Sequence, residues 1–140
     1  MAQQSTGLTI PIEAVQARAY TIPTDRPEAD GTLAWHDTTI VIAQVAAGGY
    51  QGIGYTYSHA AAAKLINSTL AQTLQDLDAM SVPLLWQRMV AATRNYGRAG
   101  IVSAAIAAVD TALWDLKAKR LGLPLALLFG KVRDQVPVYG

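Results

Sequence analysis

The sequence predicts an α+β fold in which a small antiparallel sheet comes first and helices that cover one of its faces follow. Three observations indicate this fold. Residues 12–22 alternate in polarity as a strand does, residues 38–57 read as a hairpin, and helical spacing begins only after Ser58. A doubly wound fold would instead alternate strands with helices along the chain.

The first strand is expected over residues 12–22. Val15 and Ala17 fall on one face of this segment, and Gln16 and Arg18 fall on the other. The residues that follow, Pro23 to Ala34, are crowded with proline, aspartate and glycine, so we expect an exposed loop there. It is long for a connector, and long ordered loops are often functional.

The hairpin is expected from two extended stretches around a glycine pair. Residues 38–46 are rich in β-branched side chains, Ala47 to Tyr50 supply the turn, and residues 51–57 place Ile53, Tyr55 and Tyr57 at period two. With the first strand, the hairpin makes a three-stranded antiparallel meander. A sheet of this size has to bury one face against helices.

A bundle of about three helices is expected to cover that face. Ser58 is a candidate cap for the first helix, and a second helix should begin at Ser81 and end near residues 95–97. The third should span residues 101–121, where alanine and larger apolar residues form a broad stripe. Gly122 is expected to end it.

Composition excludes several classes of partner. Half of the residues are apolar and the formal net charge is +1, so the chain has no electrostatic footprint for nucleic acid or an anionic membrane. Asp110 interrupts the apolar run of residues 99–109 well before the roughly 20 apolar residues that a membrane span needs. The absence of cysteine, and of a signal-like pattern in the polar residues 1–7, predicts a cytoplasmic protein.

The most specific signal lies in and after the third helix. Residues 107–119 read AAVDTALWDLKAK, and residues 121–125 and 127–130 read LGLPL and LLFG. In these sequence motifs and in the order of its predicted elements, the chain resembles the mandelate racemase and muconate-lactonizing branch of the enolase superfamily. The resemblance implies an N-terminal capping domain that folds over the catalytic face of a (β/α)8 barrel and shapes substrate specificity.

The same resemblance implies a division of the chain. Residues 1–10 would be a disordered N-terminus, residues 11–130 the α+β capping domain, and residues 131–140 the start of the barrel, with its first strand at 136–140. Because such a barrel takes roughly 250 residues, the rest of it would lie outside this sequence. A complete enzyme is expected to form a homo-oligomer.

The implied chemistry lies in the barrel. Members of this branch remove a proton next to the carboxylate of a small acid, and Mg²⁺ stabilises the resulting enediolate. The resemblance places the lysine or histidine acid/base groups and the carboxylate ligands of Mg²⁺ in the barrel, so no catalytic and no metal-binding residue is expected in this chain. By itself it should be inactive.

Four residues are candidates for contact with substrate. The segment Pro23 to Ala34 matches the variable specificity loop of the family, with Arg26 near its start and Trp35 directly after it, and residues 54–58 match its second capping loop. Tyr55 is the strongest candidate, because the resemblance implies that its position at the exit of the hairpin faces the bound ligand, and a phenol there offers apolar surface together with one hydrogen-bonding tip. Thr56 is its neighbour.

Several other features have ordinary structural explanations. Lys117 and Lys119 spell a Lys-x-Lys string, but residues two apart on a helix point about 200° apart and cannot converge on one carbon. Asp115 and Lys119 are spaced for an i,i+4 pair. His36 and His59 have no suitably spaced partners for a metal site.

The sequence is compatible with two functional hypotheses. The chain is the capping part of a metal-dependent isomerase or lyase, or it is a free-standing module that reuses the capping fold to bind a small acid or a protein without catalysing a reaction. Stabilisation of the chain by carboxylic acids in the absence of Mg²⁺ would favour the free-standing module.

Overall fold

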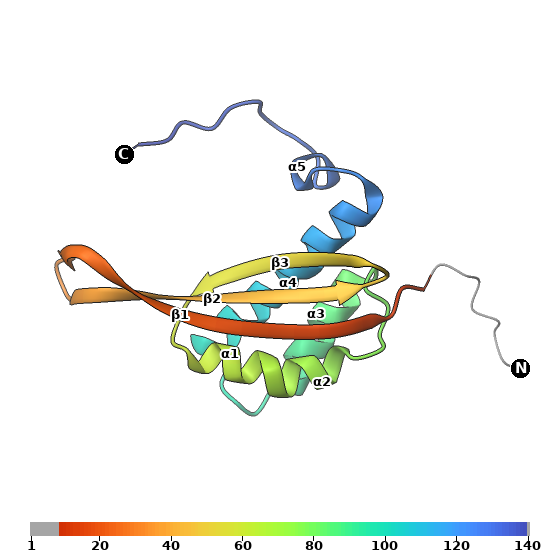
Figure 1. Cartoon of the computed structure of the whole chain (residues 1–140), viewed down its shortest axis with the longest axis horizontal. Coiled ribbons are helices and arrows are strands. Elements are labelled where there is room, and N and C mark those ends of the chain that lie inside the picture. The colour runs from red at the N-terminus through yellow and green to blue at the C-terminus, as the bar shows by residue number, and fades with distance from the viewer. Residues whose placement is uncertain (1–8, 140) are drawn as a thin grey trace, which may run out of the picture.

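The computed structural model describes residues 9–139, and its three strands form one antiparallel sheet. The strands are β1 (Ile12–Ala29), β2 (Ala34–Ala47) and β3 (Tyr50–Tyr57), hydrogen-bonded in the order β1-β2-β3 (Figure 1). Gly48 and Gly49 both have positive φ and form the two-residue turn between β2 and β3. The α+β class and the antiparallel meander are therefore confirmed.

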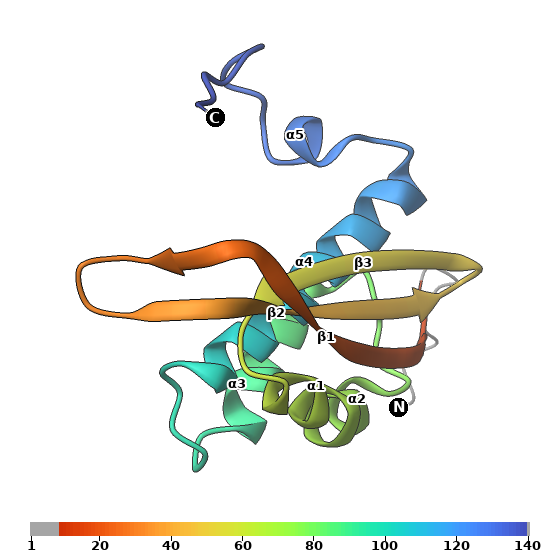
Figure 2. The same cartoon turned by 60° about the vertical axis from the view of Figure 1, so that its left-hand side comes forward.

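The helices gather on one side of this sheet, which leaves its other face uncovered by helix (Figures 1 and 2). They are α1 (Ala61–Leu65), the π-helical turn η1 (Ile66–Leu70), α2 (Ala71–Leu74), α3 (Val82–Ala92) and α4 (Ile101–Leu121), whereas the short α5 (Leu125–Leu128) follows α4 and lies apart from this layer. The segments α1, η1 and α2 follow one another without a break and make up the first expected helix. None of the helices within residues 9–139 is long and apolar enough to span a bilayer.

The longest helix, α4, has the bounds that the sequence predicts. Gly122 follows it in the left-handed conformation, with φ 67° and ψ 27°, and its N–H donates to the carbonyl of Lys119. The side of α4 that faces the sheet carries small residues, and Ala105, Ala108 and Ala112 are fully buried. A helix with so little side-chain bulk can approach a neighbouring backbone closely.

Two glycines of β3 make use of this close approach. A Cβ atom built on Gly52 would lie 1.9 Å from the carbonyl oxygen of Ala112, and one on Gly54 would lie 2.1 Å from that of Ala108. No side chain fits in the space between β3 and α4. Backbone packs almost directly on backbone there, and the alternate residues of β3 point away from the helix.

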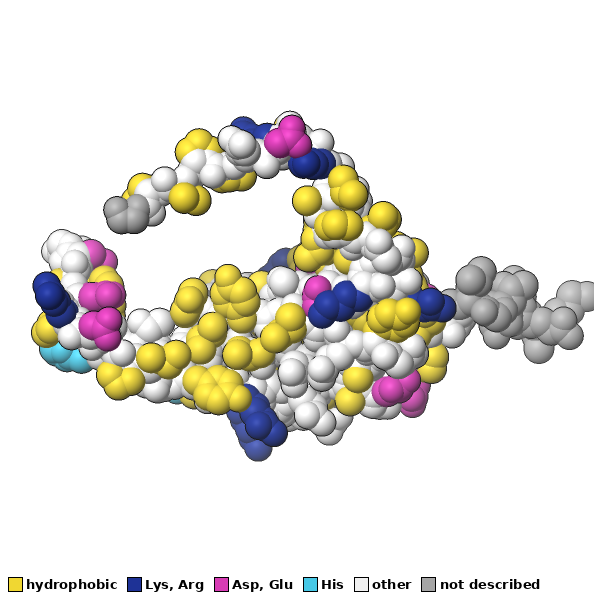
Figure 3. All heavy atoms as spheres, turned by 45° about the horizontal axis from the view of Figure 1, so that its top comes forward, with side chains coloured by type: hydrophobic (Ala, Val, Ile, Leu, Met, Phe, Trp, Pro, Cys, Tyr) yellow, Lys and Arg dark blue, Asp and Glu magenta, His cyan; other side chains and the backbone are white. Residues whose placement is uncertain are grey.

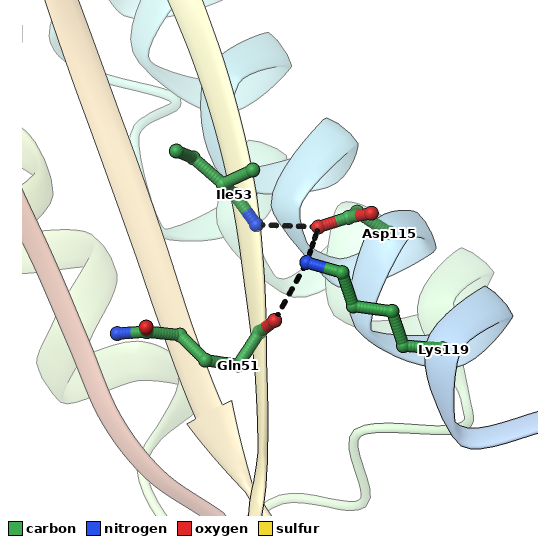
Figure 4. A network of polar contacts seen from close by, with 4 residues as sticks. All are labelled: Gln51, Ile53, Asp115 and Lys119. Atoms are coloured by element: carbon green, nitrogen blue, oxygen red, sulfur yellow. Dashed lines mark hydrogen bonds and ion pairs between the residues drawn. The ribbon is translucent and has the colours of Figure 1, made fainter.

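The free edge of β3 is closed by two side chains of α4 (Figure 4). Asp115 accepts a hydrogen bond from the N–H of Ile53 at 2.8 Å, and Lys119 Nζ donates to the carbonyl of Gln51 at 3.0 Å. The two side chains also form the expected i,i+4 ion pair, with 2.7 Å between Nζ and Oδ2. The ion pair is confirmed, and its role in closing the strand edge is new.

The opposite edge of the sheet is closed in a similar way. Asn67, on η1, accepts a hydrogen bond from the N–H of Ala17 at 2.7 Å and donates one to the carbonyl of the same residue at 2.9 Å. Its side-chain amide thus takes the place of a neighbouring strand. Beside it, Ile12 exchanges backbone hydrogen bonds with Asp76 and Leu77 in the loop that follows α2.

The expectation of a loop over Pro23 to Ala34 is wrong for most of that segment. Pairing continues to Glu28 with Trp35 and Ala29 with Ala34, so β1 and β2 extend beyond the rest of the sheet as a two-stranded ribbon, residues 23–37. Only residues 30–33 form the turn, in which Asp30 accepts hydrogen bonds from both backbone and side chain of Thr32. The prolines interrupt the pairing locally instead of ending it: register shifts between Pro23 and Glu28.

Three further boundaries differ from expectation. Ser58 does not cap the first helix, because its N–H still pairs with the carbonyl of Thr39, and the helix begins at Ala61. The second helix ends at Ala92, earlier than residues 95–97. The strand expected at 136–140 does not form over residues 136–139, and Gly140 lies outside the described residues. Residues 1–8 of the expected disordered N-terminus lie outside them as well. A barrel strand needs hydrogen-bonded neighbours, and no described strand pairs with residues 136–139.

Replacing Gly54 by alanine should destabilise the fold by about 3 kcal/mol or more, because the added Cβ would collide with the α4 backbone and not with a movable side chain. Urea denaturation followed by circular dichroism would measure the change. Gly31→Ala is the matched control: its Cβ meets nothing within 4 Å, so stability should change by less than about 0.5 kcal/mol. Equal effects of the two substitutions would contradict the close packing.

Replacing Asp115 by alanine should cost about 1 to 2 kcal/mol, since it leaves the N–H of Ile53 without its charged acceptor. Asp115→Asn should cost less, because the amide oxygen can still accept that hydrogen bond. Asp134→Ala removes the exposed ion pair with Lys131 and should cost less than about 0.5 kcal/mol in the same denaturation experiment. If Asp115→Ala proved as mild as Asp134→Ala, the strand-edge role would be wrong.

Candidate functional site

The face of the sheet turned away from the helices is unusually apolar for an exposed surface. We call it the outer face. Figure 3 shows hydrophobic side chains grouped over the strands on this side of the molecule. Strand register places seven apolar residues on it, and the polar Gln16, Arg18 and Gln44 lie on the same face at its other end. The apolar residues are Tyr20, Ile22, Ile40, Ile42, Ile53, Tyr55 and Tyr57. A contiguous apolar face of this kind marks a surface that another structure covers.

Two tyrosines of β3 dominate the end of the outer face next to the ribbon. Tyr55 is 59% exposed and Tyr57 is 67% exposed. Their rings meet edge to face, with centroids 6.0 Å apart and an interplanar angle of 78°. They therefore form one exposed aromatic surface.

A hollow of ≈ 580 Å³ opens at the base of the ribbon, beside Tyr57. Its apolar wall includes Ile22 and Ile40, and its polar wall includes Thr24, Asp25 and Glu28. The hydroxyl oxygen of Thr24 is buried and has no hydrogen-bond partner among residues 9–139. The hollow thus combines an aromatic wall with carboxylates and one hydroxyl group that could bond a polar ligand.

A second hollow of ≈ 450 Å³ lies on the other side of Tyr57, where β3 leads into α1. Trp35, Asp37 and His59 are among the residues that line it. Tyr57 and Thr38 line both hollows, so Tyr57 stands between the ribbon and the start of the first helix. A third hollow, of ≈ 500 Å³, lies beside Gln16, Arg18 and Gln44, outside the tyrosine cluster.

The four sequence-predicted residues do not converge. Tyr55 is on the outer face, whereas Thr56, the next residue along the strand, points to the helix side and is half-buried. Tyr55 pairs with Ile42 on β2, and Trp35 precedes Ile42 by seven residues. Trp35 therefore lies about 23 Å along the strand from the position of Tyr55. Arg26 is exposed in the part of the ribbon where the register shifts.

Tyr57 is the residue that sequence reasoning passed over. It shares the face of Tyr55 by strand alternation and lies closer to the ribbon, where it lines a hollow together with Trp35. The period-two pattern of Ile53, Tyr55 and Tyr57 was the signal that could have identified it.

The ribbon side of this site is negatively charged. Hydrogen bonds from the hydroxyl and N–H of Thr32 and from the N–H of Leu33 lower the pKa of Asp30, so its carboxylate stays ionised at neutral pH. Glu28 accepts a hydrogen bond from Trp35 Nε1 at 2.8 Å, which fixes the indole along the ribbon. The candidate site therefore has aromatic and acidic parts.

The other polar residues singled out in the sequence, the two lysines of the Lys-x-Lys string among them, have separate contacts. Lys117 donates to the carbonyl of Met80 at 2.8 Å, whereas Lys119 reaches β3, so the two ammonium groups diverge as expected. His59 Nδ1 accepts a hydrogen bond from the N–H of Ala61. Burial raises the pKa of Asp110, which lines a separate cavity beside Trp86 and Arg98.

Over residues 9–139, no group of three or more histidine, aspartate or glutamate side chains could hold a metal ion.

The chain resembles a set of known enzymes over most of its length. The family model described as "Mandelate racemase / muconate lactonizing enzyme, N-terminal domain" matches residues 14–130. The L-talarate/galactarate dehydratase of Salmonella typhimurium is 38% identical over an alignment of 112 positions, which covers 74% of this chain and 27% of that protein. The 3,6-anhydro-alpha-L-galactonate cycloisomerase of Streptomyces coelicolor is 37% identical over an alignment of 134 positions, which covers 91% of this chain and 37% of that protein.

Solved structures agree with these relatives. A mandelate racemase/muconate lactonizing enzyme-like protein from Rubrobacter xylanophilus superposes with a TM-score of 0.82 and 48% identity, covering 84% of this chain and 33% of that one. The chain thus spans about a third of the length of the proteins that it matches. On the match over residues 14–130 and these identities, it belongs to the mandelate racemase/muconate lactonizing enzyme family, as an N-terminal domain.

Proposed function

We propose that this chain is the active-site cap and specificity domain of a sugar-acid dehydratase or cycloisomerase. The observation that carries the proposal is the apolar outer face, which ends in an aromatic surface beside a polar hollow. In this proposal the outer face closes over the catalytic end of a (β/α)8 barrel. Residues 11–130 form the cap, and residues 131–140 lead into the first barrel strand.

The substrate would be a small hydroxylated carboxylate. The relatives include L-talarate/galactarate dehydratase, the cycloisomerase and an L-rhamnonate dehydratase from Saccharopolyspora erythraea, and one solved dehydratase holds Mg together with L-lyxarohydroxamate. In the complete enzyme, Mg²⁺ would stabilise the enediolate that forms when a proton leaves the carbon beside the carboxylate. Its ligands and the acid/base groups would come from the barrel, so this chain alone would be inactive.

Within the cap, each part of the site has a separate task. Tyr55 and Tyr57 would form an apolar wall and offer hydroxyl groups to the substrate. Thr24 and the carboxylates of Asp25 and Glu28 suit the hydroxyl groups of a sugar acid, since carboxylates accept hydrogen bonds.

Arg26 and Trp35 would act from the ribbon, which takes the place of the variable specificity loop. The helix-side position of Thr56 gives it no part in this surface. The complete protein would be a cytoplasmic homo-oligomer.

A chimera tests the role of Tyr57. Residues 14–130 would replace the matching segment of the Salmonella L-talarate/galactarate dehydratase, and steady-state kinetics with galactarate would be measured. Tyr57→Ala should raise KM about tenfold with a smaller change in kcat, because it removes contacts made to bound substrate and not to the reacting atoms.

Tyr50→Ala is the matched control. Tyr50 is an exposed tyrosine at the other end of the same strand, so its removal should leave KM nearly unchanged. Equal effects of the two substitutions would refute the capping site. Stabilisation of the chain alone by galactarate without Mg²⁺, seen as a raised Tm, would favour the free-standing module instead.

A further inference from the structure

The two hollows beside Tyr57 are lined by carboxylates. Asp25 and Glu28 line the hollow at the base of the ribbon, and Asp37 lines the hollow where β3 leads into α1. All three are exposed residues of the ribbon. Figure 3 shows acidic side chains at the far end of the ribbon, together with a basic side chain. Each hollow therefore has an anionic wall next to the tyrosine.

No lysine or arginine of residues 9–139 lines either hollow. Arg26 lies on the ribbon outside both linings and forms no ion pair with the described carboxylates. Arg18 lines the third hollow, four residues before Ile22 on β1, which corresponds to about 13 Å along the strand. The negative charge of the two walls is therefore not neutralised by a neighbouring cation of the described chain.

His59, in the lining of the second hollow, adds no positive charge in this arrangement. Its Nδ1 accepts a hydrogen bond from the N–H of Ala61 at 3.1 Å, so Nδ1 carries no proton. The ring is then neutral, with its proton on Nε2. The two hollows together hold three carboxylates and no cationic side chain from residues 9–139.

Hydrogen bonding in the hollows favours the same kind of ligand. Within the described residues, the carboxylates of Asp25 and Asp37 accept no hydrogen bond, and Glu28 accepts one from Trp35 Nε1. Thr24 Oγ1 is buried without a partner. The hollows therefore need hydrogen-bond donors, which the hydroxyl groups of a sugar supply and an ionised carboxylate does not.

We propose that the cap favours sugar acids with a single carboxylate over diacids. The inference rests on the proposed function, which places the reacting carboxylate at the barrel and leaves the other end of the substrate against Tyr57. An uncharged, hydroxylated end would donate hydrogen bonds to the carboxylates of the hollows. A second carboxylate would instead face three like charges in a partly enclosed site, where water screens charge less than in bulk solvent.

Sequence identity does not separate these two classes of substrate. Relatives named for galactarate, which has a carboxylate at each end, and for 3,6-anhydro-alpha-L-galactonate, which has one, are 38% and 37% identical to this chain. The charge of the hollows supplies the distinction that identity does not.

Charge-neutral variants test the proposal in the chimera with the Salmonella dehydratase. The triple variant Asp25→Asn, Glu28→Gln, Asp37→Asn removes three charges at nearly constant shape, and the glutamine keeps an oxygen that can accept from Trp35. Galactarate is measured as the substrate. Galactonate, which has a hydroxyl group in place of the second carboxylate, is measured as a competitive inhibitor, so its binding is read without turnover.

The KM for galactarate should fall in the triple variant, because the repulsion is removed. The Ki for galactonate should rise, because an amide oxygen is a weaker acceptor than a carboxylate. The ratio of Ki to KM should therefore rise at least about tenfold. The single variants Asp25→Asn and Asp37→Asn leave the hydrogen bonds within residues 9–139 in place, and each should raise the ratio about threefold.

Asp76→Asn is the matched control. Asp76 follows α2 and bonds the backbone of Ile12, which lies ten residues from Ile22 along β1, or about 33 Å. Asparagine tolerates the positive φ of 62° at this position, so the substitution removes a charge without strain. The ratio of Ki to KM should stay the same.

An unchanged or lowered ratio in the triple and single variants, with folding verified by circular dichroism, would overturn the proposal, as would an equal rise in Asp76→Asn. The Tyr57→Ala chimera separates this inference from the proposed function. If Tyr57→Ala raises KM while the neutral variants leave the ratio unchanged, the capping role stands and the selectivity for a single carboxylate is wrong. If Tyr57→Ala leaves KM unchanged, the proposed function fails, and this inference fails with it.

Discussion

The fold depends on the close approach of α4 to β3. Because Gly52 and Gly54 have no side chain, the backbone of β3 lies directly against the backbone of α4 near Ala108 and Ala112. This contact has a consequence for the opposite face. Gly52 and Gly54 take inward positions of β3, and the alternating residues Ile53, Tyr55 and Tyr57 point outward. The packing that anchors the sheet thus also creates the aromatic surface of the candidate site.

A sheet of three strands has two free edges and only one central strand, so each edge is exposed to pairing with other chains. Here the helices close both edges with side chains. Asn67 bonds the N–H and carbonyl of Ala17, and Asp115 with Lys119 bonds the backbone of β3. The same helices that bury the inner face therefore limit the sheet to three strands. Without these groups, the apolar outer face would be bordered by unpaired backbone.

Much of the fold could be predicted from the sequence because its signals are local. The glycine pair at 48–49 and the apolar stripe of α4 up to Gly122 act within a few residues, and the structure has both where they were expected. The ribbon was predicted wrongly because proline and glycine were taken to end pairing, whereas the chain passes over Pro23 and Pro27 by shifting register. The prediction that Ser58 caps the first helix was wrong, because the N–H of Ser58 still pairs with the carbonyl of Thr39 in the neighbouring strand.

The candidate site could be predicted only in part, since its geometry depends on contacts between distant segments. Alternation could assign Tyr55 and Tyr57 to one face, but the position of Tyr57 between the ribbon and α1 follows from the strand pairing. In the same way, the i,i+4 spacing of Asp115 and Lys119 predicts their ion pair and says nothing of the strand edge 62 residues away in sequence that Asp115 reaches.

Because of the register shift between Pro23 and Glu28, the ribbon can change in length without changing the strand pairing in the rest of the sheet. In a regular strand, one inserted residue would move every following side chain to the opposite face. An insertion or deletion among residues 24–27 would be absorbed in the segment that is already out of register, and the pairing from Pro23 back to Ala14 would keep its alternation. The ribbon can therefore change in length and composition during evolution while the core beneath it stays the same.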